Sequence, residues 1–203
     1  MPSVRVAPDP TPPPSARLVA RVGGLLTGNE PLRLFTTLGR HRRLSRWWLP
    51  FAGTLLLRGR LPRPDSEVVV LRVAWNCNCW YEWVQHAQLA KRAGVTEPEI
   101  AASAVGPAHD CWTPRRRLLL ELVDELHATN VIGDPAWERV SRELATEEII
   151  ELCFLVGHYE MLAMALNSLG VEPEPTALRK LEPGCSELAD RLRQQLARMR
   201  TGS

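Results

Sequence analysis

The sequence lacks any stretch of about 18 consecutive uncharged apolar residues, the length that a membrane-spanning helix requires. Its first 14 residues contain Arg5 but no apolar segment as long as that of a signal peptide. We therefore expect a cytoplasmic protein that does not bind membranes. The 203 residues, 45% apolar and 24% charged, suffice for one soluble domain with a full hydrophobic core.

The cysteines do not form a recognisable framework. There are five of them, an odd number, at positions 77, 79, 111, 153 and 185, and no secretory signal precedes them, so a disulfide scaffold is not expected. Cys77-Asn78-Cys79 has a one-residue spacing, unlike a zinc knuckle or a thioredoxin-type pair, and no second cysteine pair completes a tetrahedral site. The sequence therefore predicts no metal site.

Acidic residues are scarce at the start of the chain. Residues 1–60 contain ten arginines against Asp9 and Glu30, whereas residues 61–203 contain fifteen basic and twenty-one acidic residues. A basic section can bind nucleic acid, but these arginines alternate with apolar residues in helical order and accompany no nucleic-acid-binding motif. We expect a helical layer that pairs with the acidic remainder, in the same or a neighbouring subunit, and no nucleic-acid partner.

No segment shows the sustained alternation of a β-strand bounded by hairpin turns, so the predicted fold class is all-α. Residues 1–29 are expected to be a proline-rich, partly disordered arm, residues 30–172 a helical domain, and residues 173–203 a linker with a C-terminal helix. Apolar periodicity and capping residues predict seven or eight helices, at about 31–38, 45–57, 65–93, 97–105, 114–129, 135–144, 146–168 and 186–199.

The predicted helix over residues 65–93 contains neither glycine nor proline. Residues three and four apart share one face of a helix, so Cys79, Glu82 and His86 are expected to lie side by side, and Glu67 and Trp75 extend their stripe. A desolvated carboxylate has a raised pKa, and a neighbouring imidazole can share its proton, as general acid–base catalysis requires. The alternative is an exposed Glu82–His86 pair and a Cys79 that serves as a small buried apolar residue.

Three segments resemble the carboxymuconolactone decarboxylase and alkylhydroperoxidase-D-like superfamily. The run EVVVLRVAWNCNCWYEWVQHAQLAKRAGV, from Glu67, is similar to its signature helix. RRRLLLELVDELHATNVIGDPAWERV and ELCFLVGHYEMLAMALNSLGV are similar to its later helices, in the same order. The resemblance covers about residues 30–172. It implies the helical fold of that superfamily and an assembly of three or six subunits, with active sites near the subunit contacts.

The match to the peroxidase members is incomplete. Glu67, Cys79 and His86 occupy their glutamate, first-cysteine and histidine positions, but Glu82 replaces the second cysteine, the thiol that attacks the peroxide in those enzymes. Cys77 would lie about 200° around the helix from Cys79, too far to substitute for it without unwinding. The resemblance therefore implies the decarboxylase branch, with acid–base chemistry and no metal or organic cofactor.

Four residues are catalytic candidates. His86 is expected to be the general acid or base, and Glu82 either orients its imidazole or acts as the base itself. Glu67 is either catalytic or a carboxylate that favours the positive end of the helix. Cys79 is either a redox thiol or a residue that only lines the pocket.

Five further residues are candidates for substrate binding: Arg72, Trp75, Tyr81, His158 and Tyr159. Arg72 can bind a carboxylate bidentately, with a salt bridge to Glu67 or to another subunit as the alternative. The expected substrate is a small organic acid, lactone or biosynthetic intermediate. Two other functions stay open: a thiol-dependent hydroperoxidase that uses Cys79, and a non-catalytic helical oligomer with a binding role.

Overall fold

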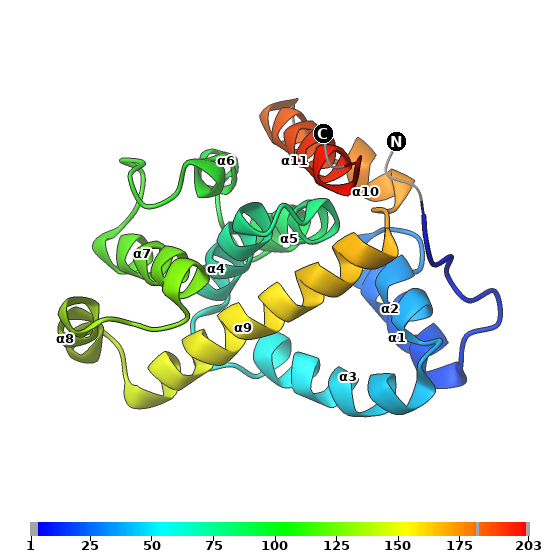
Figure 1. The fold of residues 1–203 in the computed structure, drawn as a ribbon, viewed down its shortest axis with the longest axis horizontal. Helices are drawn as coiled ribbons and strands as arrows, with labels where there is room; N and C mark the ends of the chain where they lie inside the picture. Colours follow the sequence, from blue (N-terminus) through cyan, green and yellow to red (C-terminus); the bar gives the residue numbers. More distant parts are fainter. Residues whose placement is uncertain (1–3, 182, 202–203) are drawn as a thin grey trace.

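The computed structural model describes residues 4–181 and 183–201, and over these residues it contains helices and no strand (Figure 1). The predicted all-α class is therefore confirmed. The described part has eleven helices, more than the seven or eight expected: α1 Pro14–Thr27, α2 Arg33–Leu38, α3 Arg42–Leu57, α4 Arg63–Asn76, α5 Trp80–Arg92, α6 Glu97–Val105, α7 Pro114–Thr129, α8 Asp134–Glu143, α9 Thr146–Leu169, α10 Pro175–Arg179 and α11 Pro183–Thr201.

Helix α4 is the centre of the molecule and divides its apolar interior into two parts (Figure 1). Its β-branched run is helical because neighbouring helices bury it on every side, and this packing outweighs a weak local preference for strand. The α7/α9 core contains Val69, Val70, Val73, Leu119, Leu122, Val123, Leu152, Leu155 and Leu166. The α5/α11 core contains Val68, Leu71, Ala74, Trp83, Val84, Ile100, Leu120, Ala189 and Leu192.

The predicted single helix over residues 65–93 is wrong, because the chain breaks between α4 and α5. Asn78 has a positive φ of 51°, and the amide of Cys79 donates to the carbonyl of Ala74 at 2.8 Å. Asparagine tolerates the left-handed conformation that commonly ends a helix. Cys79 then precedes the first turn of α5, so it does not share a helical face with Glu67 as expected.

The N-terminal arm contacts the rest of the chain over its described residues. Its amides at Arg5 and Val6 both donate to the carbonyl of Leu169, at 3.0 and 2.9 Å. Helix α1 falls inside the predicted arm, where Gly23 and Gly24 weaken the helical pattern. A Cβ on Gly24 would lie 2.5 Å from the carbonyl oxygen of Glu30, so the chain needs a glycine at this close approach.

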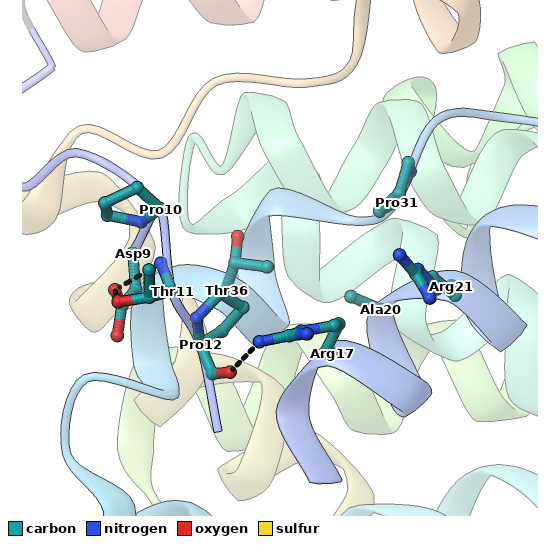
Figure 2. A pocket seen from close by; sticks show the side chains of 9 residues that line it. All are labelled: Asp9, Pro10, Thr11, Pro12, Arg17, Ala20, Arg21, Pro31 and Thr36. Carbon is teal, nitrogen blue, oxygen red and sulfur yellow. Dashed lines mark hydrogen bonds between the residues drawn. The ribbon is translucent and has the colours of Figure 1, made fainter. Parts of the chain in front are cut away.

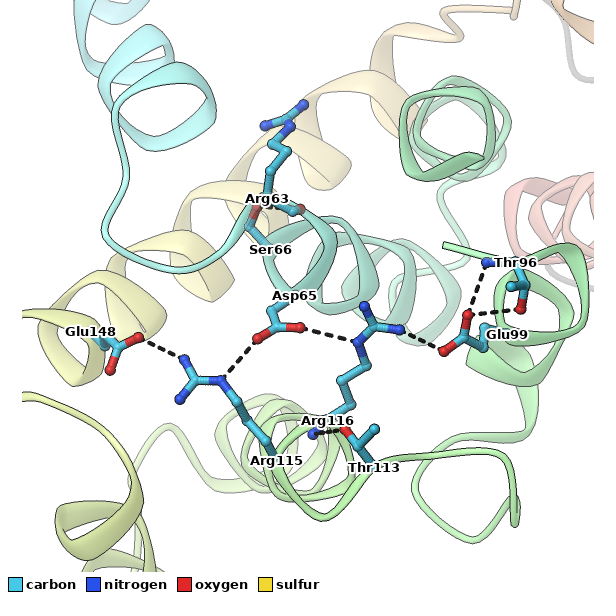
Figure 3. Close-up of polar contacts among 9 residues, drawn as sticks. All are labelled: Arg63, Asp65, Ser66, Thr96, Glu99, Thr113, Arg115, Arg116 and Glu148. Carbon is cyan, nitrogen blue, oxygen red and sulfur yellow. Dashed lines mark hydrogen bonds and ion pairs between the residues drawn. The ribbon is translucent and has the colours of Figure 1, made fainter. Parts of the chain in front are cut away.

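An ionic network joins the first turn of α4 to its neighbours (Figure 3). Asp65 accepts from Arg115 at 2.9 Å and from Arg116 at 3.0 Å, both in the first turn of α7. Arg115 also forms an ion pair with Glu148 of α9, and Arg116 forms one with Glu99 of α6. Because one buried carboxylate links three further helices, the network fixes the end of α4 that leads to Glu67.

Helix α9 is long and apolar enough to cross a membrane by length and composition alone. Half of its most apolar 18-residue window is buried in the protein, as in the core helix of a globular domain. It begins where Glu148 accepts from the amide of Ala145 at 2.9 Å, and it ends at Gly170, which has a φ of 74°. Both ends lie within one residue of the predicted ones.

Candidate active site

Two residues on different helices form the centre of the site. Nδ1 of His86, on α5, lies 2.7 Å from Oε2 of Glu67, on α4. The Glu67 side chain is fully buried and that of His86 is 8% exposed. The other carboxylate oxygen of Glu67 forms an ion pair with Arg63, one turn earlier on α4. The structure thus pairs His86 with Glu67, and not with Glu82 as the helical spacing predicted.

Glu82 lies in the first turn of α5, and its side chain is also buried. Neither of its oxygens accepts a hydrogen bond from the described residues. Burial raises the pKa of Glu82 well above its usual value, an effect that the nearby Cys79 thiol only partly opposes. Burial therefore favours the protonated form of Glu82, the form that can donate a hydrogen bond.

The Cys79 thiol is completely buried. Desolvation raises its pKa well above the usual value, and the neighbouring Glu82 carboxyl raises it further. A nucleophilic cysteine needs the opposite surroundings, a partner that favours the thiolate. As the structure stands, Cys79 is a neutral thiol.

Two aromatic residues of α9 extend the site. The ring of Tyr159 lies edge-on to His86, with centroids 5.0 Å apart, and edge-on to His158 at 5.2 Å. Burial, followed by the carboxylates of Glu67 and Glu82, raises the pKa of Tyr159 well above 10. Both α9 residues predicted from the sequence therefore lie beside His86.

His158 adds an unpaired polar atom to this region. Its Nδ1 is buried without a hydrogen-bond partner among the described residues. Burial, with a smaller contribution from His86, lowers the pKa of His158 to about 4, so the ring is neutral at pH 7. Trp48 and Phe51 of α3 cover this ring at centroid distances of 6.0 and 5.3 Å. No motif in the sequence indicates that α3 contributes to the site.

Arg72 and Tyr81, two residues of the predicted substrate-binding set, have hydrogen-bond partners within the chain. Arg72 donates to both oxygens of Asp124 at 2.6 and 2.9 Å, and to the carbonyls of Ser103 and Ala104. Its guanidinium is therefore already occupied, by a partner other than the predicted Glu67.

The Tyr81 hydroxyl donates to Glu174 at 3.2 Å and accepts from the amide of Leu34 at 3.2 Å. Glu174 is almost fully buried and also accepts from the amide of Arg33 at 2.6 Å. Tyr81 therefore joins α5 to the chain around α2 and α10. Trp75 is half-buried and packs against the α5/α11 core, so no contact places it with His86.

A cavity of about 490 Å³ opens between the N-terminal arm, α1 and α2 (Figure 2). The residues that line it are Asp9, Pro10, Thr11, Pro12, Arg17, Ala20, Arg21, Pro31 and Thr36. None of the predicted site residues is among them. The buried acid–base cluster lies apart from this cavity, among residues of α3, α4, α5 and α9.

Comparisons with known proteins agree with this architecture. Residues 42–125 match the model of the carboxymuconolactone decarboxylase family. A protein described as an alkylhydroperoxidase AhpD core, an uncharacterised peroxidase-related protein of Ralstonia eutropha JMP134, has 17% identity and a TM-score of 0.77, covering 86% of this chain and 95% of its own. An uncharacterised peroxidase-related protein of Silicibacter sp. TM1040 has 14% identity and a TM-score of 0.76, covering 87% and 95%.

The debrominase Bmp8, in its apo form, has 13% identity and a TM-score of 0.71, with coverage of 94% of this chain and 98% of its own. No curated protein matches the sequence. At these identities the solved structures support the fold and not a shared reaction. The family model matches the part of the chain that runs from α3 to α7.

Proposed function

We propose that this chain, a member of the carboxymuconolactone decarboxylase and alkylhydroperoxidase-D-like superfamily, is an enzyme that transfers protons to and from carbon in a small organic acid or lactone. The observation that carries the proposal is the buried 2.7 Å contact between His86 and Glu67. It fixes the imidazole in a site that also holds Glu82, a carboxyl without a partner among the described residues. An imidazole and a carboxyl on one helix are the kinds of group that general acid–base catalysis uses.

The roles follow from the hydrogen bonds. Glu67 accepts from Nδ1–H of His86, which leaves Nε2 as the atom that exchanges a proton with the substrate. Protonated Glu82 donates a hydrogen bond to the oxygen on which negative charge develops. His158, neutral at pH 7, is a second polar contact for the substrate.

Decarboxylation of a carboxylated lactone shows how bonds, electrons and protons would move in such a reaction. The bond between the ring carbon and its carboxylate breaks, and carbon dioxide leaves. The electron pair moves into the conjugated lactone carbonyl to form a dienolate, whose oxygen is stabilised by Glu82. Protonated His86 then gives a proton to the carbon and regains one from water.

A thiol-dependent hydroperoxidase is the alternative, supported by the likeness to peroxidase-related proteins. The surroundings of Cys79 disfavour it, because burial and a carboxyl neighbour both oppose the thiolate. The second cysteine of the peroxidase pattern is Glu82, which cannot form a disulfide with Cys79.

We also propose that the active form is a homo-oligomer. The α3 and α9 helices expose large apolar side chains beside the site: Trp47 at 70%, Ile150 at 54%, Phe154 at 58%, Met161 at 51% and Met164 at 67%. Phe51 and Phe154 already meet edge-on at 6.4 Å, which makes this apolar surface continuous between the two helices. A second copy would cover it. Light scattering should give a multiple of the 22.8 kDa chain mass, and Phe154→Glu should lower it.

The test separates acid–base from thiol chemistry. The purified chain is incubated with a carboxymuconolactone and related carboxylated lactones in deuterated water, and loss of carbon dioxide and uptake of one deuteron at carbon are followed by NMR. A parallel assay uses cumene hydroperoxide with a dithiol reductant. His86→Ala should lower kcat for the carbon acid by about 10²–10⁴-fold, whereas Cys79→Ser should retain most of the activity.

His109→Ala and Cys111→Ser are the matched controls, because both residues lie outside the site and away from the core. Circular dichroism checks whether every variant keeps its helices. Hydroperoxide turnover that Cys79→Ser abolishes, together with no turnover of the carbon acids, would contradict the proposal.

A further inference from the structure

Three side chains outside the acid–base site meet where α4, α7 and α9 converge. The Sγ of Cys77, a ring nitrogen of His127 and a carboxylate oxygen of Glu160 all lie within 4.8 Å of one another. Among the described residues, no other group of three or more histidines, cysteines and acids meets this distance. A thiolate, an imidazole and a carboxylate are together a ligand set that zinc prefers.

The backbone holds Cys77 in place without help from a ligand. Its amide donates to the carbonyl of Val73 at 2.9 Å, as the last bond of α4. Its carbonyl accepts from Nδ2 of Asn167, on α9, at 2.9 Å. The left-handed residue that follows turns the chain toward α5, so Cys77 is fixed at the corner between the two helices.

His127 and Glu160 approach Cys77 from the other two helices. His127 lies in the last turn of α7, and its Nδ1 is 2.7 Å from Oε1 of Glu160. The His127 side chain is 39% exposed and that of Glu160 is 17% exposed. The cluster therefore has one side open to solvent, by which an ion can enter and a water molecule can bind.

We infer that this cluster binds a divalent transition-metal ion, zinc by ligand preference, through Cys77, His127 and Glu160, with water as the fourth ligand. Tetrahedral zinc separates such ligand atoms by about 3.4–3.6 Å, given its usual bond lengths. The three atoms need to move by about an ångström or less, which side-chain rotations supply. The sum of charges at the site is then zero, because thiolate and carboxylate balance the ion.

Binding moves two protons. The thiol of Cys77 loses its proton to solvent as the sulfur–metal bond forms. The proton between Nδ1 of His127 and Glu160 shifts to Nε2, so that Nδ1 and the carboxylate oxygen both become free to bind. One proton is therefore released for each ion bound, and no oxidant or reductant takes part.

The prediction from sequence that no metal binds considered only ligands spaced closely along the chain. His127 follows Cys77 by 50 residues, and Glu160 follows His127 by 33. At such spacings no short sequence motif indicates a metal site. The simpler interpretation is a surface His–Glu pair next to an ordinary cysteine. Metal binding distinguishes the two.

The test uses the full chain, reduced and freed of metal by a chelator. Zinc is titrated by calorimetry in two buffers of different ionisation enthalpy, which counts released protons. Cobalt(II) is titrated by absorption, where a thiolate ligand gives a charge-transfer band in the near ultraviolet. The variants are Cys77→Ser, His127→Ala and Glu160→Gln, with Cys111→Ser and Cys153→Ser as controls for exposed thiols.

We expect one ion per chain, one proton released, and a cobalt charge-transfer band. Cys77→Ser should abolish the band and weaken zinc binding by at least about tenfold, and the other two ligand variants should weaken it to a similar extent. Glu160→Gln still accepts a hydrogen bond from His127, so its loss of binding does not reflect loss of fold. No binding by the native chain, a band that survives Cys77→Ser, or a band lost in Cys111→Ser would overturn the inference.

Discussion

Nδ1 of His86 lies 2.7 Å from Oε2 of Glu67, across 19 residues of sequence and a break between two helices. Glu67 lies on the central helix α4, and its side chain is fully buried. Its carboxylate therefore sets the orientation of the His86 ring. A side-chain hydrogen bond of this kind determines which ring nitrogen faces a substrate.

Glu67→Gln should lower kcat for the proposed carbon-acid reaction by about 10²–10⁴-fold, because the amide no longer stabilises a protonated imidazole. Steady-state kinetics measures the change. Glu121→Gln is the control, since Glu121 pairs with Arg139 at the surface at 2.7 Å. Equal kcat values for Glu67→Gln and the native chain would refute an orienting and charge-stabilising role.

Glu82 should make the stability of the protein depend on pH. Its pKa is raised in the folded state, so the folded chain keeps a proton that the unfolded chain loses above pH 4.5. The stabilising effect of that proton is complete below pH 4.5 and is lost as the pH rises toward the folded pKa. The free energy of unfolding falls by up to about 1.4 kcal/mol per pH unit over this window.

In Glu82→Gln this dependence disappears. Urea denaturation between about pH 4.5 and pH 7 should therefore show the variant gaining stability relative to the native chain as the pH rises. Glu138→Gln, at an exposed position, is the control that should show no such trend. A difference between native and Glu82→Gln chains that is constant with pH would argue that Glu82 ionises normally.

Asn78 should tolerate glycine but not alanine. Its φ of 51° costs a residue with a Cβ about 1–2 kcal/mol, a cost that asparagine partly offsets and glycine avoids. Asn78→Ala should lower the free energy of unfolding by about 1 kcal/mol, and Asn78→Gly should change it by less than half as much. If chemical denaturation finds both variants equally destabilised, the asparagine side chain, and not the backbone conformation, is the reason.

Asp65→Asn should destabilise the protein by about 2 kcal/mol, because it removes the charge that Arg115 and Arg116 share. The estimate is below that for a fully buried pair, since Arg115 is 32% exposed. Glu121→Gln, at an exposed pair, should cost less than about 1 kcal/mol. Thermal and urea denaturation compare the two, and equal effects would show that the network adds little.

The sequence predicts most helices from α6 to α9 within a residue or two, because their ends are local chemistry. Thr96 and Glu99 exchange hydrogen bonds at the start of α6, and Gly170 takes the left-handed conformation after α9. Such signals need only neighbouring residues. The buried positions of His158 and Tyr159 were likewise predictable from the apolar sequence around them.

The remaining features depend on packing. The break at Asn78 was missed because asparagine is also found inside helices, and only the tertiary structure selects its left-handed form. The partner of His86 is set by how α4 and α5 pack, which helical spacing cannot reveal. Arg72 binds Asp124, 52 residues later, so its occupied guanidinium was equally hidden.

The amides of Arg5 and Val6 donate hydrogen bonds to the carbonyl of Leu169, in the final turn of α9. In the same turn, Nδ2 of Asn167 donates to the carbonyl of Cys77. The N-terminal arm therefore supports the turn between α4 and α5, which is more than seventy residues away in sequence. Removing the N-terminal arm would leave the Leu169 carbonyl to bind water and would weaken the hydrogen bond between Asn167 and Cys77. An expression strategy that trims the proline-rich start would alter the interior as well as the surface.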